Sequence, residues 1–251
     1  MLFQNRRTVD FVICGTQKGG TTALHAYLRG HPEVCMADRK GVHFFDNEEY
    51  FSQGKPDYSK YHAWFSPGKS HKLLGEATPI YMYWNESPRR IWEYNPNMKL
   101  IVLLRDPIKR SYSHWNMQRL KNVENLSFWE AIKNEKERCR KALPQQHRRY
   151  SYIDRGLYLE QLRRLWAYFT KDRVLVIKSE DLKQNPGETL SRVCNFLGIG
   201  QFKSIVPKNL NSRPYLSSIT KMEKDYLRSI FEPETKKLEI ELNWDYSDWL
   251  G

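Results

Sequence analysis

The chain has few cysteines, and their spacing argues against two kinds of site. The four cysteines, Cys14, Cys35, Cys139 and Cys194, form no C-x-x-C pair and have no histidine pattern beside them. We therefore expect neither a zinc site nor a disulfide framework. Cys14 and Cys194 lie in apolar runs, which predicts that both are small residues of the core.

Long hydrophobic runs are also missing. No run approaches the length of a membrane span, and the start "MLFQNRRTVDFVICG" lacks the apolar stretch of a signal peptide. We expect no stable membrane insertion and a cytoplasmic location. Internal repeats, low-complexity tracts and long Gly/Ser linkers are absent as well, and 251 residues can bury one sizeable core. The sequence thus predicts one domain over residues 1–251.

Negative charge is in short supply. Lysine and arginine outnumber aspartate and glutamate by 41 to 29, which gives a net charge of +12. This excess indicates an anionic partner, such as a phosphorylated cofactor, an acidic glycan or lipid, or nucleic acid, unless it only keeps the surface soluble. The basic residues are spread along the chain and form no known nucleic-acid-binding motif, so we expect no nucleic-acid partner.

Short apolar runs followed by helical patterns predict the fold class. The runs "FVICG" (11–15), "KLIVLL" (99–104) and "RVLVIK" (173–178) are typical of buried parallel strands, and "HKLLGEA" (71–77) is a shorter candidate. Helices are expected at 21–29, after Asp106, and at 157–169, 185–198 and 218–231, with Asn185 capping the fourth and a polar surface loop at 139–155. We predict an α/β domain with a central parallel sheet flanked by helices.

The stretch "ICGTQKGGTTAL" joins the first predicted strand to the first predicted helix. Gly15 and Gly20 have the spacing of a nucleotide-triphosphate P-loop, but Thr21 stands where that loop has its lysine, and Lys18 lies inside the loop. A glycine turn before a helix presents backbone N–H groups and the positive end of the helix dipole, which is an anion site. The candidate phosphate-binding residues are Gln17, Lys18, Gly19, Gly20, Thr21 and Thr22.

This loop resembles the 5′-phosphosulfate loop of sulfotransferases that use 3′-phosphoadenosine 5′-phosphosulfate (PAPS), in particular the heparan sulfate sulfotransferases and their bacterial relatives. The resemblance continues in order through "HPEV", "VHFFD", "GEATPIYMY", "PRR", "LLRDPIKRSYSHW", "RGLYLEQLRRLWAYF" and "FEPETKKL". It therefore covers nearly the whole chain. It implies the P-loop-like sulfotransferase fold, transfer of a sulfuryl group, release of 3′,5′-adenosine bisphosphate (PAP) and no required metal.

The same resemblance implies a second phosphate site, because PAPS carries a 3′-phosphate. The family holds it with an arginine at a strand end and a serine eight residues later, which here are Arg105 and Ser113. An arginine and a hydroxyl are suitable phosphate donors on chemical grounds as well. The segment "NLNSRPY" resembles the cofactor-closing loop of bacterial relatives, which makes Arg213 and Tyr215 candidate cofactor contacts.

Three residues are candidates for the chemistry. Lys18 would stabilise the charge that develops on the leaving phosphate. Glu76, at the end of an apolar strand, matches the base of the N-sulfotransferase branch, and His43 in "VHFFD" is an alternative base. The chain departs from the family twice, because Gly41 stands where the 3-O-sulfotransferases have a catalytic glutamate and Ala77 replaces the usual lysine.

Two other functions remain as alternatives. A P-loop kinase or nucleotidase would bind ATP with magnesium, although Thr21 in the lysine position argues against it. A basic nucleic-acid-binding module is the weaker alternative.

The acceptor of a sulfotransferase would be a small molecule or a glycan. Stretches such as "YHAWF" and "QQHRRYSY" suit an acidic sugar, a phenol or a lipid headgroup equally, and nothing in the sequence selects an oligomeric state.

Overall fold

The computed structural model describes residues 7–205 and 214–250. They belong to two compact units, of which the first comprises residues 1–104 and 164–212 and the second residues 105–163 and 213–251. The prediction of one domain over residues 1–251 stays a prediction. Among the described residues, no helix combines the length and apolar character that a membrane crossing needs.

The first unit contains a five-stranded sheet in the order β2-β3-β1-β4-β5, in which all four pairings are parallel. Its strands are β1 (Phe11–Gly15), β2 (Val34–Met36), β3 (Leu73–Ala77), β4 (Lys99–Leu104) and β5 (Val174–Lys178). The predicted α/β class with a central parallel sheet is confirmed. The four predicted strands are present within one or two residues of their expected starts, whereas β2 was not predicted.

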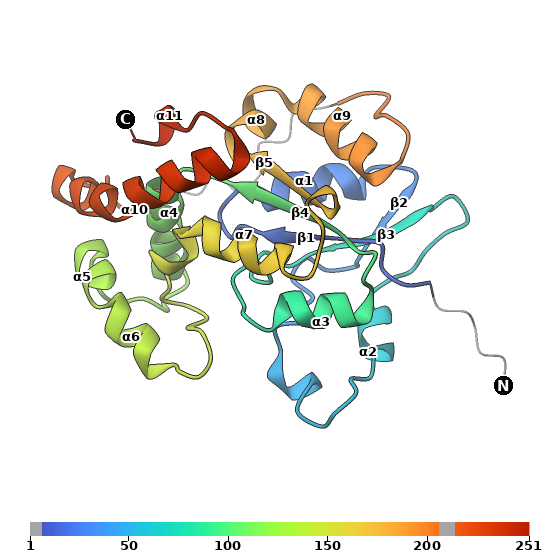
Figure 1. Cartoon of the computed structure of the whole chain (residues 1–251), viewed down its shortest axis with the longest axis horizontal. Helices are drawn as coiled ribbons and strands as arrows, with labels where there is room; N and C mark the ends of the chain where they lie inside the picture. The colour runs from blue at the N-terminus through green and yellow to red at the C-terminus, as the bar shows by residue number, and fades with distance from the viewer. Residues whose placement is uncertain (1–6, 206–213, 251) are drawn as a thin grey trace. The chain divides into compact units, whose positions relative to one another are not determined.

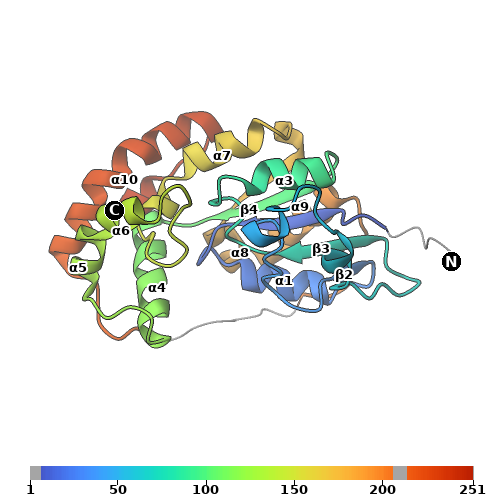
Figure 2. The same ribbon diagram turned by 90° about the horizontal axis from the view of Figure 1, so that it is seen from below.

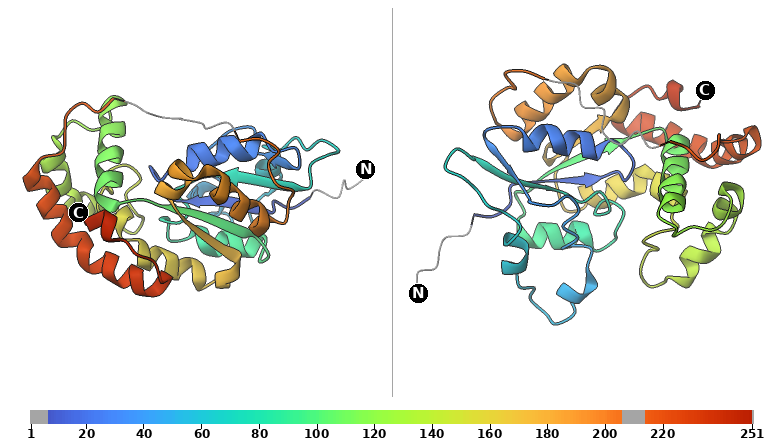
Figure 3. Two further views of the ribbon diagram at one scale, coloured as in Figure 1. Left: turned by 90° about the horizontal axis from the view of Figure 1, so that it is seen from above. Right: turned by 180° about the vertical axis from the view of Figure 1, so that it is seen from behind.

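Helices cover both faces of this sheet (Figure 1). α1 (Thr21–Arg29) and α9 (Pro186–Leu197) lie on one face, as the view from above in Figure 3 shows, and α3 (Ser87–Tyr94) lies on the other. The unit also contains α2 (Ser59–His62), α8 (Ser179–Gln184) and the short 3-10 helices η1 (Glu48–Tyr50) and η3 (Lys171–Arg173). α7 (Tyr158–Trp166) contributes residues to both units.

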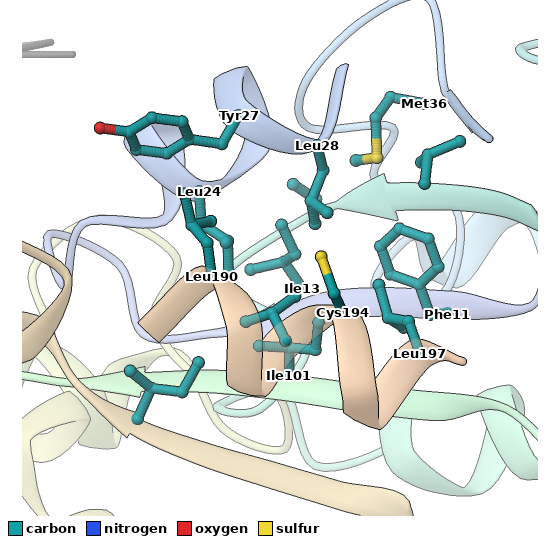
Figure 4. Close-up of a cluster of buried hydrophobic side chains, with 14 of the residues drawn as sticks. Phe11, Ile13, Leu24, Tyr27, Leu28, Met36, Ile101, Leu190, Cys194 and Leu197 are labelled. Carbon is teal, nitrogen blue, oxygen red and sulfur yellow. The ribbon is translucent and has the colours of Figure 1, made fainter. Parts of the chain in front are cut away.

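The core of the first unit lies between the sheet and the α1–α9 layer (Figure 4). Strand side chains meet helix side chains there, and all are at most 3% exposed: Phe11, Ile13, Ile101, Leu24, Leu28, Leu190, Cys194 and Leu197. Cys14 is also wholly buried, and all four cysteines are free thiols. The predicted core positions of Cys14 and Cys194 are therefore confirmed.

The strand order creates a switch point beside the loop that follows β1. From β1 the chain leaves towards β2 on one side of the sheet, whereas from β4 it continues towards β5 on the other. Ligands of open α/β sheets bind where the connections diverge in this way, outside the carboxyl ends of the strands. The loop that follows β1 lies at this position.

The second unit is helical. It contains α4 (Pro107–Leu120), α5 (Phe128–Lys133), α6 (Glu135–Lys141), η2 (Asp154–Gly156), α10 (Lys221–Leu242) and α11 (Ser247–Leu250). The helices α4, α5 and α10 lie together in Figure 2 around a shared apolar cluster. Asp106 caps α4 as predicted, since its carboxylate accepts hydrogen bonds from the N–H groups of Ile108 and Lys109.

Three expectations about local structure need correction. Residues 139–155 are not all a surface loop, because α6 extends into them and the side chains of Tyr152 and Arg155 are buried. Asn185 is the N-cap residue of α9, but its side chain makes no capping hydrogen bond, and Pro186 occupies the first position of the helix. The last long helix is α10, which continues well past residue 231 even though Pro233 lies within it.

Candidate functional site

The loop after β1 is held tightly against β4. The N–H of Thr16 donates to the carbonyl of Leu103 at 3.1 Å, and the N–H of Gly19 donates back to the Thr16 carbonyl at 2.9 Å. A Cβ atom at Gly19 would lie only 2.5 Å from the Leu103 carbonyl oxygen, so no other residue fits. Gly20 has a φ of +92° and Lys18 a φ of +71°, a backbone conformation that residues other than glycine rarely adopt.

This loop leads directly into the N-terminus of α1. Gly20 is the N-cap residue and has no side chain that could accept a hydrogen bond from the first turn of the helix. The N–H of Ala23 already donates to the Gly20 carbonyl at 3.0 Å, so this helix end can offer an anion its dipole and the N–H groups that precede Ala23. A Cβ atom at Gly20 would lie 3.2 Å from the Ser179 hydroxyl, so Ser179 at the start of α8 adds a donor beside the loop.

Glu76 is wholly buried in a cage of hydroxyl groups at the end of β3. The Thr78 hydroxyl donates to its Oε2 at 2.6 Å and the Tyr61 hydroxyl to its Oε1 at 3.1 Å. Tyr81 also hydrogen bonds to the carboxyl group. Burial is the main reason that the pKa of Glu76 is raised to about 7. The hydroxyl donors lower this pKa and the nearby Asp46 raises it further. A proton can therefore reside on Glu76 near neutral pH.

His43 differs from Glu76 in being open to solvent. Its side chain is 50% exposed, whereas that of Asp46 is wholly buried. The Nδ1 atom of His43 lies 3.0 Å from the Oδ2 atom of Asp46. A carboxylate at Nδ1 favours the tautomer that carries its proton there, which leaves Nε2 as the acceptor. His43 also has a φ of +56°, which is a left-handed backbone conformation that is uncommon for residues other than glycine.

The structure brings His43 and Glu76 together through Thr78. The Thr78 hydroxyl accepts hydrogen bonds from the N–H groups of Val42 at 3.0 Å and His43 at 3.5 Å while it donates to Glu76. A second anchor lies further along the segment, where the guanidinium of Arg90 forms an ion pair with Glu48 and donates to the Phe45 carbonyl. Both predicted bases are thus held by the end of β3 and by α3.

The remaining predicted cofactor residues belong to the second unit. Arg105 follows the last residue of β4 in the chain, and its carbonyl accepts a hydrogen bond from the Tyr158 hydroxyl at 2.7 Å. Ser113 lies on α4 and is 8% exposed. Tyr215 is half exposed and stacks on Tyr112, the neighbour of Ser113, with ring centroids 5.5 Å apart. Arg213 lies outside the described residues.

Asn116 on α4 fixes the backbone on both sides of Tyr215. Its side-chain amide donates to the Pro214 carbonyl at 3.2 Å and accepts from the N–H of Leu216 at 3.1 Å. The Tyr112 hydroxyl completes the attachment with a hydrogen bond to the Ser217 carbonyl at 2.6 Å. One helix therefore carries Ser113 and positions the segment that contains Tyr215.

Sequence reasoning missed several residues of this arrangement. Asp46 was available in the sequence as the last residue of "VHFFD", three positions after His43, where a turn can bring the two side chains together. Thr78, which links both candidate bases, and Ser179, which lies beside the loop, follow the ends of β3 and β5. Their signal was position, because side chains just beyond the carboxyl ends of parallel strands gather at one edge of the sheet. No group of three or more metal-ligating side chains that could hold an ion occurs in the described part of the chain.

These features define a class of protein. A parallel sheet with a lysine-containing glycine loop at its switch point, followed by a helix with a glycine as its N-cap residue, is typical of α/β proteins that bind phosphate groups. The sequence of residues 8–229 matches the family model of the sulfotransferase domain. The chain belongs to the sulfotransferase family.

Individual relatives agree with this assignment. The chain is 26% identical to the membrane-associated sulfotransferase kil1 of Dictyostelium discoideum over 94% of its own length and 66% of the relative's. It is 33% identical to human heparan sulfate glucosamine 3-O-sulfotransferase 6 over 77% of its length, and this match spans 53% of the human protein. The chain thus covers between half and two thirds of these relatives.

Among solved structures, a sulfotransferase from Alicyclobacillus acidocaldarius superposes with a TM-score of 0.83 and 25% sequence identity, over 97% of this chain and 99% of the other. The sulfotransferase domain from the curacin biosynthetic pathway has the same fold at a TM-score of 0.55 and 14% identity. The sulfotransferase fold predicted from the sequence is therefore confirmed.

Proposed function

We propose that the protein is a PAPS-dependent sulfotransferase. It would transfer the sulfuryl group to a hydroxyl or amine of a small-molecule or glycan acceptor and release PAP, without a metal and in the cytoplasm. The observation that carries the proposal is the loop between β1 and α1, in which Lys18 has a left-handed backbone and precedes an anion-binding helix end. Membership of the sulfotransferase family supports the sulfuryl group as the group transferred.

The loop would bind the 5′-phosphosulfate. Gly19 and Gly20 would let the backbone approach the phosphate, the N–H groups of Thr21 and Thr22 would donate to its oxygens, and the hydroxyls of these two threonines would add further donors. In the reaction, the acceptor atom bonds to sulfur while the bond from sulfur to the 5′-phosphate oxygen breaks. Lys18 would stabilise the negative charge that this oxygen acquires.

The other predicted cofactor residues would bind the rest of the nucleotide. Arg105 and Ser113 are the proposed donors to the 3′-phosphate, one charged and one neutral. Tyr215 offers a half-exposed ring that an adenine base can stack on, and Asn116 would hold that ring in place through the two backbone hydrogen bonds around it. Arg213 remains a candidate contact from the sequence.

We assign the role of general base to His43 rather than to Glu76. A base must reach the acceptor proton, and His43 is half exposed with its Nε2 available once Asp46 holds Nδ1. Glu76 has no exposed surface, and three hydroxyl groups surround its carboxyl. Glu76 would instead act as a positioning residue, because it orients the Thr78 hydroxyl on which the backbone of His43 rests.

Calorimetric titration with PAP and with ATP, each with and without magnesium, tests the proposal. We expect tight binding of PAP that magnesium does not change, and weak binding of ATP, which lacks a 3′-phosphate. Arg105→Ala should weaken PAP binding by about 10- to 100-fold, which corresponds to the loss of one charge-assisted hydrogen bond. ATP binding that depends on magnesium, with no preference for PAP, would instead support a P-loop kinase or nucleotidase.

A further inference from the structure

Lys40 lies on the segment between β2 and the candidate base, and its neighbours fix the course of the chain. The N–H of Asp38 donates to the Trp64 carbonyl at 2.8 Å, and the guanidinium of Arg39 lies 5.1 Å from the centre of the Trp64 ring. On the other side, the N–H of Gly41 donates to the Ala77 carbonyl at 2.9 Å. Lys40 is therefore held between two anchored stretches, the second of which continues to His43.

The Lys40 ammonium lacks the partner that a sheltered cation normally has. Its side chain is largely withdrawn from water, and no described residue gives it a hydrogen bond or an ion pair. Desolvation alone lowers the pKa of Lys40 to about 8, with no nearby carboxylate to oppose it. The fold thus maintains a cation without its counter-charge, which is costly unless a ligand supplies that charge.

His25 on α1 provides a second, independent observation. Its side chain is 7% exposed, and its Nε2 atom has no hydrogen-bond partner among the described residues. Burial and the positive charges of Lys40 and Arg29 lower the pKa of His25 to about 4, so the ring is neutral at pH 7. In its neutral form the ring can carry its N–H at Nε2 and donate it to an anion. His25 belongs to the helix that the phosphate loop opens.

We propose that Lys40, with His25 nearby, forms an anion-binding site on the segment that carries His43, and that this site takes a negatively charged oxygen group. The group is either the sulfuryl group of the donor or a carboxylate or sulfate on the acceptor. This inference rests on the proposed function, because it deepens the description of the same site.

Chemical labelling of lysines by acetic anhydride at pH 8, with peptide mass spectrometry as the readout, tests the site directly. The wild-type protein is labelled alone, with PAP, with PAPS, and with sodium sulfate added to each, using sodium chloride of equal ionic strength to control for screening. We expect labelling of Lys40 to fall about tenfold at a ligand concentration about ten times the Kd. Lys69, which is exposed, is the internal control and should not change.

The arms of the experiment separate the two sources of the anion. Protection of Lys40 by PAPS but not by PAP identifies the sulfuryl group of the donor. Protection only when sulfate is added to the PAPS-bound protein identifies an anionic group of the acceptor. Lys40 labelling that no ligand reduces beyond the chloride control overturns the proposal. Failure of PAP to bind would contradict the proposed function instead, and sulfate added to the protein alone would then still decide whether the site exists.

The variant Lys40→Met supplies a second measurement that does not depend on lysine chemistry. Methionine keeps an unbranched side chain and removes a cation that has no described partner, so the variant should be at least as stable as the wild type. If the sulfuryl group is the ligand, affinity for PAPS should fall about tenfold or more while affinity for PAP is unchanged. Lys69→Met is the matched control. Equal PAPS affinity in both variants, together with no protection by sulfate, would exclude the site.

Discussion

Replacing Glu76 by glutamine should remove a pH-dependent cost from the folded protein. Glu76 is wholly buried, and its pKa is raised from 4.5 to about 7. Below pH 4.5 the carboxyl group is protonated in both the folded and the unfolded chain. Between pH 4.5 and 7 the unfolded chain releases this proton while the folded chain retains it, so stability falls as pH rises. Well above pH 7 the group is ionised in both states, and stability no longer changes with pH on its account.

The magnitude follows from the pKa difference. A rise from 4.5 to about 7 corresponds to about 3 kcal/mol at 25 °C. Glutamine has the shape of the protonated acid and carries no charge. The Thr78 hydroxyl can continue to donate to the amide oxygen, and the Tyr61 hydroxyl can rotate to accept from the amide nitrogen, so both can pair with the new amide. The stability of Glu76→Gln relative to the wild type should therefore increase by about 2 to 3 kcal/mol between pH 5 and pH 8.

Urea unfolding of both proteins without nucleotide, followed by tryptophan fluorescence at several pH values, measures this difference. Glu135, whose burial also raises its pKa to about 7, contributes equally to both proteins and cancels. A stability difference that stays constant from pH 5 to 8 would mean that Glu76 is ionised throughout in the folded state, and the argument from burial would be refuted. The same variant should keep its PAP affinity and lose less than about tenfold in turnover, since we assign the general base to His43.

Three further predictions concern the proposed site. Lys18→Ala should lower turnover at least as severely as it weakens PAP binding, measured by steady-state kinetics and calorimetry; unchanged turnover would remove Lys18 from the chemistry. Asp46→Asn should reduce turnover by about 10²- to 10⁴-fold with unchanged PAP affinity, because His43 would lose the carboxylate that fixes its tautomer, and an effect on affinity alone would argue against this role. Asn116→Leu should weaken PAP binding by about 10-fold, whereas Asn125→Leu, on the loop before α5, should leave it unchanged; equal affinities would show that the Tyr215 segment needs no such support.

The sequence predicted the sheet well because its strands are buried on both faces. Such strands appear as continuous apolar runs, and β1 and β4 have the predicted boundaries. β2 escaped prediction because Val34–Met36 is too short to form a recognisable run and is defined by its pairing with β3. The extent of α10 was underestimated for a related reason, since Pro233 argues for a break that the packing of Phe231 and Leu238 on either side of it overrides.

The part of the candidate site that rests on one short motif could be predicted from the sequence. The part that depends on contacts between side chains distant in the sequence could not. The loop with Lys18 could be predicted as an anion site from its glycines between a predicted strand and a predicted helix, and its resemblance to the sulfotransferase loop gave the ligand expected there. The choice between Glu76 and His43 could not, because it depends on which side chain water reaches, and that is decided by Tyr61 and Thr78 covering Glu76. Lys40 shows the same limit. The sequence does not tell whether a lysine has an ion-pair partner, and only the structure shows that no described residue pairs with Lys40.

Two residues of the proposed chemistry, Lys18 and His43, have a left-handed backbone conformation. Among the described residues, the non-glycine positions with positive φ are Lys18, His43, Asn122 and Asn243. Asparagine adopts this region readily, whereas for lysine the conformation costs on the order of 1 kcal/mol that glycine would avoid. Lys18 is held there because Gly19 is pressed against the Leu103 carbonyl and cannot give way. We infer that the fold retains the Lys18 side chain despite this cost for its ammonium group, which in the proposed reaction would stabilise the departing phosphate oxygen.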